Sequence, residues 1–246
     1  MVKMRLDKFL SDATAYSRKE LKTMIRRGQV TVNGSVVKVP EQQVGEDAAV
    51  TVNGTEVRYR KFVYLMMNKP AGFISATEDG NAPVVTELLP EEYKHFNVFP
   101  AGRLDKDTQG LLILTNDGAF GHQVTSPRRQ VWKRYFATLD RPAESADCAA
   151  FEQPMDLGDF IAAPGRLYIC RNAAEVYVEI AEGKFHQVKR MCEKIGKKVV
   201  TLKRCAIGGV VLDESLGSGE CRELTPAELE LIVQGTLPEL AVTAKV

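Results

Sequence analysis

The sequence is poor in the residues that bind metal ions or form disulfide frameworks. Its 246 residues include only five cysteines and three histidines. The cysteine count is odd, no two cysteines have C-x-x-C spacing, and the histidines lie far apart in the chain. These features argue against a zinc or iron–sulfur site. They predict reduced thiols that pack as small apolar side chains, and we expect no bound metal.

Long apolar segments are also missing. No run approaches the roughly 18–20 apolar residues that span a bilayer, and the stretch "MVKMRLDKFL" contains no long apolar core of a secretory signal. The hydrophobic fraction of 44% and the charged fraction of 26% are ordinary for a globular protein. We therefore expect a cytoplasmic protein with no membrane partner.

The chain as a whole has almost no net charge, but its first 39 residues have an excess of positive charge. The net charge is +1, yet residues 1–39 hold nine basic and three acidic side chains, a net charge of +6. The remaining 207 residues hold 24 basic and 29 acidic side chains, a net charge of −5. A basic head on a mildly acidic body predicts a polyanion-binding module joined to a domain with another task.

The basic head has the pattern of two short helices. Ser17 and Glu20 form a capping-box pair, which predicts a helix from about residue 18 to residue 27 that stops at Gly28. Helical spacing places Leu21, Met24 and Ile25 on the core side. Four cations fall on one arc beside that apolar face: Arg18, Lys19, Lys22 and Arg26.

A shorter helix is expected over residues 6–13, with Arg5 and Lys8 facing outward. After the second helix, the pair Asn33–Gly34 lies between two alternating segments and predicts a hairpin. The near copy "VTVNGTEV", which begins at Val50, predicts a second hairpin of the same small sheet.

The second part of the chain contains a charged loop between apolar elements. The segment "FVYLMMNKPAGFIS" predicts a strand that ends sharply at Lys69–Pro70. In "AGRLDKDTQGLLILTNDG", glycines bracket a charged segment, and a buried strand over residues 111–115 follows, closed by a turn at residues 116–118. The tetrapeptide RLDK also opens the first helix, but the two contexts are unrelated, so it is not a duplication. Loops of this kind often hold catalytic residues.

Two families resemble the chain along most of its length. The pattern R-L-D-K-F-L followed by S-R-x-x-L-x-x-x-I-R-x-G-x-V-x-V-N-G resembles the S4 RNA-binding domain. The segment G-R-L-D-x-D-T-x-G-L-L-x-L-T-N-D-G resembles the signature of the RsuA-type pseudouridine synthases, and "LMMNKPAGFIS", "KRYFATL", "EGKFHQVKRM" and "LKRCAIGGVVL" resemble further motifs in the same order.

The resemblance implies an α+β protein. We expect an S4 domain of two helices plus a hairpin at residues 1–60. A catalytic domain with a mixed, largely antiparallel sheet flanked by helices is expected at residues 61–246. Helices are predicted near residues 187–195 and after Thr225, where Pro226 and Glu228 suit a first helical turn.

The resemblance also implies the roles of site residues. Asp105 matches the catalytic aspartate, and Lys189 matches the cation that keeps this carboxylate ionised. Arg103 matches a residue beside the flipped nucleotide, and Tyr135 matches an aromatic residue that stacks on the target base. The mechanism assigns no proton transfer to His186, which is expected to face the RNA or to have a structural role. The residues expected to bind RNA are Arg5, Lys8, Arg18, Lys19, Lys22, Arg26, Lys69 and Arg190.

The substrate implied is a uridine of small-subunit rRNA. The segment "HQVKRM" resembles the small-subunit branch, whose target is uridine 516 of 16S rRNA, as free RNA or in an assembly intermediate. A monomer that needs no cofactor is expected. Three alternatives stay open: a non-catalytic S4-type ribosome-assembly factor, a synthase of the same family acting on 23S rRNA, and another enzyme that cleaves RNA glycosidic bonds with the same carboxylate.

Overall fold

The computed structural model describes residues 3–240 and forms two compact units. The first unit comprises the chain up to Val63 together with Leu89–Val98, and the second comprises Tyr64–Leu88 and the chain from Phe99 onward. The segment 89–98, which includes helix α3 (Glu91–Lys94), therefore belongs to the first unit, although its position in the sequence suggested the catalytic domain.

Both predicted helices of the first unit are present. Helix α1 spans Leu6–Ala13 and helix α2 spans Arg18–Arg26, and Ser17 and Glu20 make both hydrogen bonds of the capping box. The apolar side chains on their inner faces are fully buried in one cluster, with Met24 packed at its edge: Leu6, Phe9, Leu10, Leu21 and Ile25. The apolar periodicity of the sequence was sufficient to predict this packing.

The two predicted hairpins join into one sheet. Its strand order is β3-β2-β5-β6, with Val30 of one hairpin opposite Val52 of the other. A second, two-stranded sheet pairs β1 with β4, which the sequence did not predict because each strand has only three residues. The strand bounds are β1 Lys3–Arg5, β2 Val30–Val32, β3 Ser35–Val36, β4 Gln43–Gly45, β5 Val50–Val52 and β6 Thr55–Val57.

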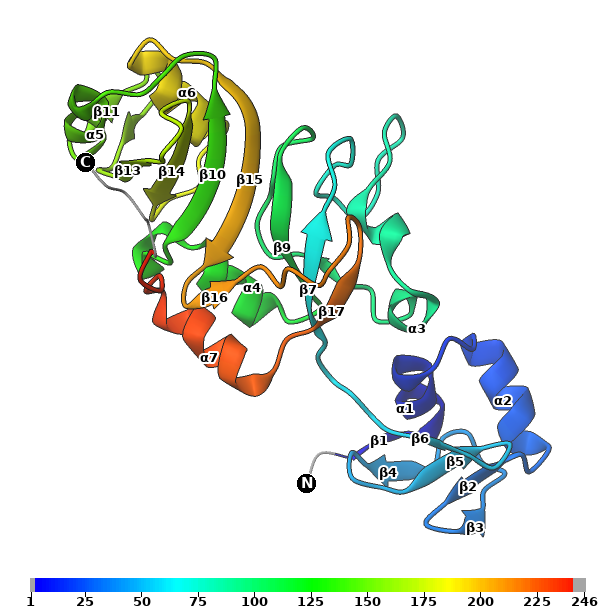
Figure 1. Cartoon of the computed structure of the whole chain (residues 1–246). Coiled ribbons are helices and arrows are strands. Elements are labelled where there is room, and N and C mark those ends of the chain that lie inside the picture. The colour runs from blue at the N-terminus through cyan, green and yellow to red at the C-terminus, as the bar shows by residue number, and fades with distance from the viewer. Residues whose placement is uncertain (1–2, 241–246) are drawn as a thin grey trace. The chain divides into compact units, whose positions relative to one another are not determined.

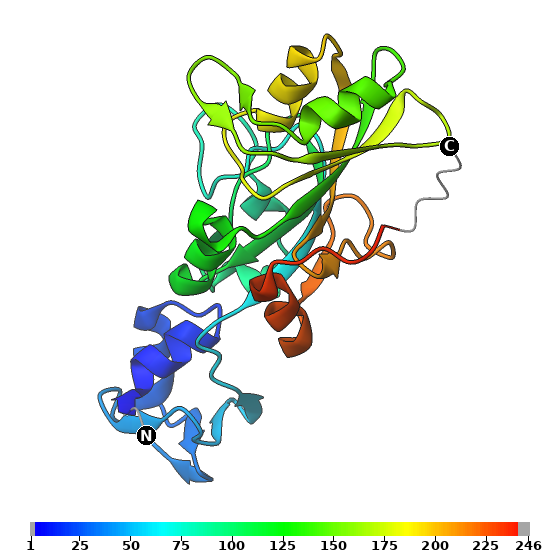
Figure 2. The ribbon, with the colours of Figure 1, turned by 90° about the vertical axis from the view of Figure 1, so that its left-hand side faces the viewer.

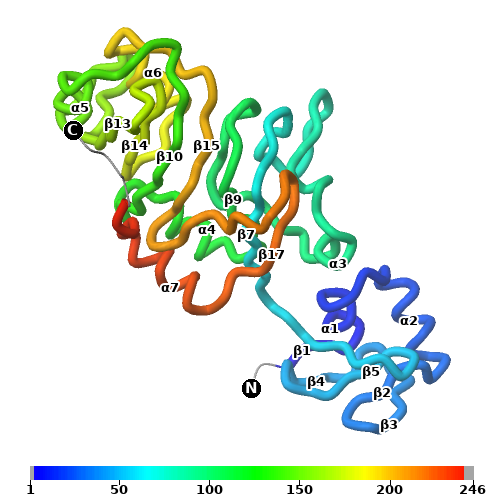
Figure 3. Tube along the Cα trace, in the orientation of Figure 1, coloured from blue at the N-terminus to red at the C-terminus, as the bar shows by residue number. Residues whose placement is uncertain are grey.

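A mixed and largely antiparallel sheet dominates the second unit, as expected from the resemblance (Figure 1). Its main order is β13-β14-β10-β15-β9-β7-β17, and only the β9–β15 pair is parallel. The trace enters this unit at β7, and the last strand, β17, pairs with β7 (Figure 3). The bounds are β7 Tyr64–Lys69, β8 Phe99–Pro100, β9 Gln109–Thr115, β10 Lys133–Leu139, β11 Met155–Asp156, β12 Ile161–Ala162, β13 Arg166–Ile169, β14 Glu175–Ile180, β15 Val199–Ile207, β16 Val210–Val211 and β17 Cys221–Glu223.

Helices flank the ends of this sheet. Helices α5 (Ser145–Phe151) and α6 (Gln187–Lys194) lie at the same end (Figures 1 and 2). Helices α4 (Gly118–Thr125) and α7 (Pro226–Gln234) pack together elsewhere, around Phe120, Val124 and Ile232. Short 3₁₀ turns occur at Val85–Leu88 and Pro127–Arg129. No helix within residues 3–240 combines the length and the apolar character that a membrane crossing requires.

The parallel contact of the sheet depends on one glycine. Gly110 has φ +100°, and a Cβ there would lie 2.2 Å from the carbonyl oxygen of Arg204, the residue opposite it on β15. A side chain at this position would push β9 away from β15. The glycine that closes the charged loop in the sequence thus allows the next strand to enter the sheet.

One local prediction was incomplete. The segment 116–118 was predicted as a simple turn, but Asp117 is the N-cap of α4 and accepts hydrogen bonds from the amides of Ala119 and Phe120. Its other carboxylate oxygen accepts the Tyr64 hydroxyl at 2.7 Å. The helix was missed because its sequence, GAFGHQVT, begins with a residue of low helix propensity.

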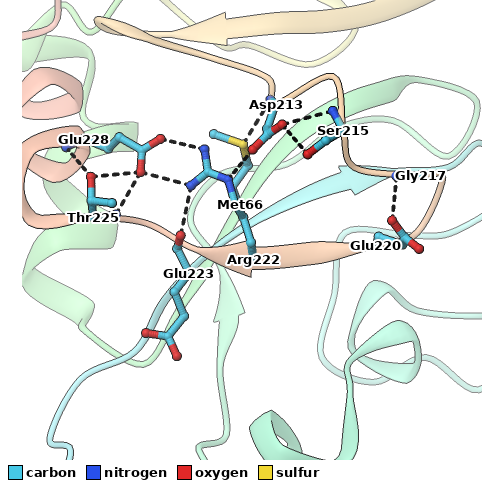
Figure 4. Close-up of polar contacts among 9 residues, drawn as sticks. All are labelled: Met66, Asp213, Ser215, Gly217, Glu220, Arg222, Glu223, Thr225 and Glu228. Carbon is cyan, nitrogen blue, oxygen red and sulfur yellow. Dashed lines mark hydrogen bonds and ion pairs between the residues drawn. The ribbon is translucent and has the colours of Figure 1, made fainter.

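The C-terminal helix is tied to the sheet by an arginine between two carboxylates (Figure 4). Arg222 donates to Asp213 at 2.6 Å and to Glu228 at 2.7 and 3.0 Å. Hydrogen bonds from Ser215 and Arg222 lower the pKa of Asp213 to about 2, and Arg222 together with Thr225 lowers the pKa of Glu228 to about 2. Glu228 also completes the predicted capping box with Thr225.

This network predicts a pH-dependent contribution to stability. Replacement of Arg222 by methionine is expected to lower the thermal midpoint at pH 7 by about 2–6 °C, because both carboxylates lose their partner. Both pKa values are depressed in the folded state, so the contribution is complete above about pH 4.5 and is lost as the pH falls toward 2. Circular dichroism melts of wild type and Arg222→Met across this range measure it.

The control is Arg141→Met, which removes an exposed cation whose one ion pair among residues 3–240 is with its neighbour Asp140. That change is expected to leave the midpoint within about 1 °C. A midpoint difference for Arg222→Met that stays constant between pH 7 and pH 2 would contradict the assignment.

Candidate active site and RNA-binding surface

The charged loop 101–108 is held by a buried lysine. Lys69, the last residue of β7, has no exposed surface. Its ammonium group donates to the carbonyls of Pro70, Asp105 and Thr108 at 2.9, 3.2 and 2.8 Å, with Lys106 O at 3.4 Å. Burial lowers the pKa of Lys69 to about 8, so the group is still mostly protonated at neutral pH.

The segment that follows Lys69 braces the same loop. The Ser75 hydroxyl donates to Leu104 O at 2.9 Å, and the amide of Leu104 donates back to that hydroxyl at 3.0 Å. The amide of Gly72 donates to Lys106 O at 2.7 Å. The "KPAGFIS" segment therefore fixes the backbone on both sides of Asp105.

Asp105 lies beside a cation from a distant part of the chain. Lys189 on α6 places its ammonium nitrogen 3.1 Å from Asp105 and 2.6 Å from Asp107. Desolvation opposes the charged form of Lys189, but hydrogen bonds with Asp107 and Asp105 raise its pKa above the ordinary value. The bond from Lys189 in turn lowers the pKa of Asp107. The arrangement holds two carboxylates on one ammonium group.

A pocket opens next to Asp105. Tyr135, in the centre of β10, is only 7% exposed and contributes to its wall together with Arg103. Arg103 is exposed and forms no ion pair among the residues that the structure describes. Further lining residues are Leu104, Thr108, Ile180, Gly183, Lys184, His186, Gln187, Val188 and Leu202. The structure thus brings Arg103, Asp105, Tyr135 and Lys189 to one place.

A strained backbone turn delivers His186 to this pocket. His186 has φ +52°, a left-handed conformation unusual for a residue with a side chain, and its Nε2 lies 3.6 Å from Asp105. Gln187 holds the turn, because its side chain accepts from the Lys184 amide and donates to Glu182. Positive φ angles of this kind concentrate at functional sites.

Two of the predicted RNA-binding residues in this unit are engaged within the protein. Lys69 is buried and its ammonium group donates to backbone carbonyls, so the prediction that it contacts RNA was wrong. The sequence showed a lysine in this motif but did not show that its side chain is buried. Arg190 pairs with Asp159 and donates to Leu157 O at 2.6 Å. It therefore fastens α6 to the loop between β11 and β12.

The first helix of the first unit carries a buried carboxylate. Asp7 is 3% exposed and accepts two hydrogen bonds from Arg5, at 3.0 and 2.9 Å. The bonds from Arg5 outweigh burial and lower the pKa of Asp7. Lys22 on α2 lies 3.9 Å from the same carboxylate, so Asp7 links the start of α1 to the middle of α2.

Other basic residues of the first unit differ in whether they form ion pairs within the protein. Arg5 also pairs with Glu41, and Lys8 pairs with Asp12 at 2.8 Å. By contrast, Arg18, Lys19 and Arg26 are exposed and form no ion pair within residues 3–240. Three of the four cations in the predicted arc of α2 therefore have charge available to a polyanion.

Sequence reasoning missed three residues of the site. Asp107 shares Lys189, Ser75 clamps Leu104, and Gln187 holds the turn at His186. The D-x-D spacing in RLDKDT was a usable signal for Asp107, because two carboxylates so close invite a shared cation. The other two act through backbone atoms, which no side-chain pattern reveals.

Comparisons with known proteins match both parts of the chain. A family model described as RNA pseudouridylate synthase matches residues 63–194, and a model of the S4 domain matches residues 4–50. A solved structure titled "Crystal structure of pseudouridylate synthase" is 35% identical and has a TM-score of 0.66, with 93% of this chain and 99% of that chain covered.

Curated relatives match over almost their whole length. An uncharacterized RNA pseudouridine synthase of Bacillus subtilis is 44% identical, covering 93% of this chain and 98% of the relative. The ribosomal small subunit pseudouridine synthase A of Vibrio parahaemolyticus is 40% identical, covering 93% and 99%. That of Salmonella typhimurium is 37% identical, covering 92% and 98%.

The buried Lys69 predicts a stability effect with a distinct pH dependence. Lys69→Met is expected to lower the free energy of unfolding by about 2–4 kcal/mol, since the loop carbonyls lose their donor. The folded-state pKa of about 8 lies below the ordinary 10.5, so the unfolded chain binds more protons between these values. The difference between wild type and variant should therefore grow as the pH rises from about 8 to 10.5, measured by urea unfolding.

Lys106→Met is the matched control, because this exposed lysine lies in the same loop and its side chain has no hydrogen bond among the described residues. It should change the free energy of unfolding by less than about 0.5 kcal/mol. Equal effects of the two substitutions would show that Lys69 does not brace the loop.

Proposed function

The chain belongs to the RNA pseudouridine synthases of the RsuA type and carries an N-terminal S4 domain, and on this premise we propose that it isomerises one uridine of small-subunit rRNA with Asp105 as the nucleophile. The observation that carries the proposal is the pairing of Asp105 with Lys189 at the pocket wall.

The pairing suits a carboxylate nucleophile. The Lys189 ammonium group 3.1 Å away orients the Asp105 carboxylate, and the loop backbone is fixed by Lys69 and Ser75. A preorganised loop places the carboxylate without a further entropy cost at the moment of reaction. Since Lys189 is also bonded to Asp107, its own position does not depend on substrate.

The reaction exchanges one glycosidic bond for another. Attack by the Asp105 carboxylate, on C1′ of the ribose or on the base, gives a covalent intermediate and allows the N1–C1′ bond to break. The detached base turns and its C5 bonds to C1′. The proton on C5 then leaves, N1 takes up a proton, and the carboxylate is released. No oxidant or reductant is consumed, because the product is an isomer of the substrate.

Tyr135 and Arg103 are suited to contact the base and a phosphate of the target nucleotide. The ring of Tyr135 contributes to the pocket wall beside Asp105, where it is suited to stack on the turning base and to assist removal of the C5 proton. Arg103 is exposed at the same pocket and has no ion pair within the described part of the chain, so it is available to a phosphate of the flipped nucleotide.

The relatives and the S4 unit support a choice of target. Two of the relatives are named ribosomal small subunit pseudouridine synthase A, and we propose the same substrate class here, with uridine 516 of 16S rRNA as the target. The free cations of α2 bind the RNA backbone and give affinity with little sequence information. A cytoplasmic monomer that acts without cofactor completes the proposal.

The activity is tested by mapping pseudouridine in 16S rRNA after incubation with wild type and with Asp105→Asn, using carbodiimide-dependent primer-extension stops. The substitution keeps the shape of the side chain and removes the nucleophile, so a loss of more than about a thousandfold is expected. Asp107→Asn is the matched control, since it neutralises the other carboxylate on Lys189, and its loss should stay within about tenfold.

The outcomes separate the alternatives. Full activity of Asp105→Asn would exclude this residue as nucleophile. A stop in 23S rRNA instead of 16S rRNA would move the target to the large subunit. RNA binding by the wild type without any pseudouridine would favour a non-catalytic assembly factor, and release of free uracil would indicate another glycosidic-bond enzyme.

The S4 surface makes a separate prediction. Lys19→Glu combined with Arg26→Glu is expected to weaken binding of 16S rRNA about 10- to 100-fold at low salt. It should also reduce the slope of log K against log salt by about 1–2, because phosphate contacts are lost. Filter binding at several salt concentrations measures both.

The control is Arg58→Glu combined with Lys94→Glu. It makes the same charge change in the same unit, but at side chains outside α2 that pair with Glu56 and Glu91. If the α2 variant leaves the salt slope unchanged, or if the control reduces the slope by the same amount, α2 does not belong to the RNA interface.

A further inference from the structure

Phe185 is an exposed aromatic side chain in the loop between β14 and α6. It is 74% exposed, more than any other large apolar residue found exposed within residues 3–240. Its ring stacks on the His186 imidazole, with 3.8 Å between centroids and 17° between planes. Because one face of the ring is covered by His186, such exposure requires that the other face is open to solvent.

The loop presents this ring in a fixed way. His186 is held at φ +52° by a neighbouring network in which Gln187 bonds to Lys184 and Glu182. The Glu182 carboxylate also accepts from the Ala163 amide. A left-handed residue with a side chain costs free energy, and the surrounding hydrogen bonds hold it in place. The exposed ring is therefore preorganised rather than an accident of a loose loop.

The stacked pair leads directly to the proposed nucleophile. His186 Nε2 lies 3.6 Å from Asp105, and the Phe185 ring is the next layer on the imidazole. A planar group on the outer face of Phe185 would lie two ring layers from His186. This places it beside the uridine in the pocket, at the distance of a neighbouring nucleotide rather than of the target itself.

The charges around the loop suit a nucleic acid. Lys184 and Arg190 lie over the ring of Phe160, at 4.4 and 4.8 Å from its centroid, and pair with Glu182 and Asp159. Lys184 is exposed at the pocket and immediately precedes Phe185 in the chain. Arg103, exposed at the same pocket, has no ion pair among the described residues and can meet a phosphate. An open aromatic face next to cations is the combination that binds single-stranded RNA, where bases stack on rings and phosphates meet positive charge.

We propose that the outer face of Phe185 stacks on an unpaired nucleotide adjacent to the target uridine. The inference rests on the proposed function and deepens it. When the uridine leaves its stack to react, its neighbour loses a stacking partner. Phe185 replaces that partner and stabilises the RNA conformation in which the uridine lies in the pocket.

The kinetic test compares Phe185→Ala with wild type on 16S rRNA. Base–aromatic stacking predicts an increase in KM of about 10- to 100-fold with kcat within about threefold, because the contact is the same in ground and transition states. The thermal midpoint and the salt slope of binding should not change, since the side chain is exposed and uncharged. A KM within twofold of wild type would overturn the proposal.

Two further variants separate stacking from apolar contact. Phe185→Trp keeps an aromatic face and should retain the wild-type KM within about threefold, whereas Phe185→Leu keeps apolar bulk and should resemble Phe185→Ala. Val211→Ala, which trims an exposed apolar side chain on β16, is the control and should change nothing. Activity of Phe185→Leu equal to that of wild type would overturn the stacking role.

A binding assay tests the proposal without requiring catalytic activity. In Asp105→Asn protein, an oligouridylate containing one 2-aminopurine is titrated with and without Phe185→Ala, and fluorescence quenching reports stacking. Loss of quenching in the double variant supports the proposal even if 16S rRNA is not the target. Equal quenching with and without Phe185 overturns the proposal. It is also overturned if Phe185→Ala raises KM only on particles that contain ribosomal proteins and not on free RNA.

Discussion

The structure of the site depends on one buried ammonium group. Lys69 lies at the end of a core strand and donates to the backbone carbonyls around Asp105. Its charge costs desolvation energy, which lowers its pKa, but the hydrogen bonds to the loop carbonyls offset part of that cost. The loop can therefore carry exposed polar residues at a fixed position, which a free surface loop would not do.

Buried charges have the same architectural use elsewhere in the chain. Asp7 joins α1 to α2 through Arg5 and Lys22, and Arg134 pairs with Glu179 at 2.7 Å inside the large sheet. In each case a charge out of water has partners, because an unpaired charge there would be costly. Arg18, Lys19 and Arg103 have no ion pair within residues 3–240 and lie at the surface, where a polyanionic ligand can supply the counter-charge.

Local features of the fold were predictable because they depend on neighbouring residues. The capping boxes at Ser17 and Thr225, the buried stripe of α2 and the hairpin at Asn33–Gly34 all follow from spacing of a few residues. The resemblance indicated Asp105, Lys189, Tyr135 and Arg103, and their roles remain proposals although the structure places them together. Lys69 shows the limit: its motif was visible, but a lysine on a strand end reads as solvent-exposed until the carbonyls around it are known.

By itself the sequence determined helices α1, α2 and α7, the two hairpins, the basic head and the charged loop between glycines, because these are encoded in composition and short-range periodicity. Only the tertiary structure decided which charges are free and which are used internally. Lys189 reaches Asp105 and Asp107 from a helix about 80 residues away, and His186 enters the pocket through a left-handed turn held by Gln187. Such contacts arise from sheet order and burial, which join distant segments and which a linear pattern does not contain.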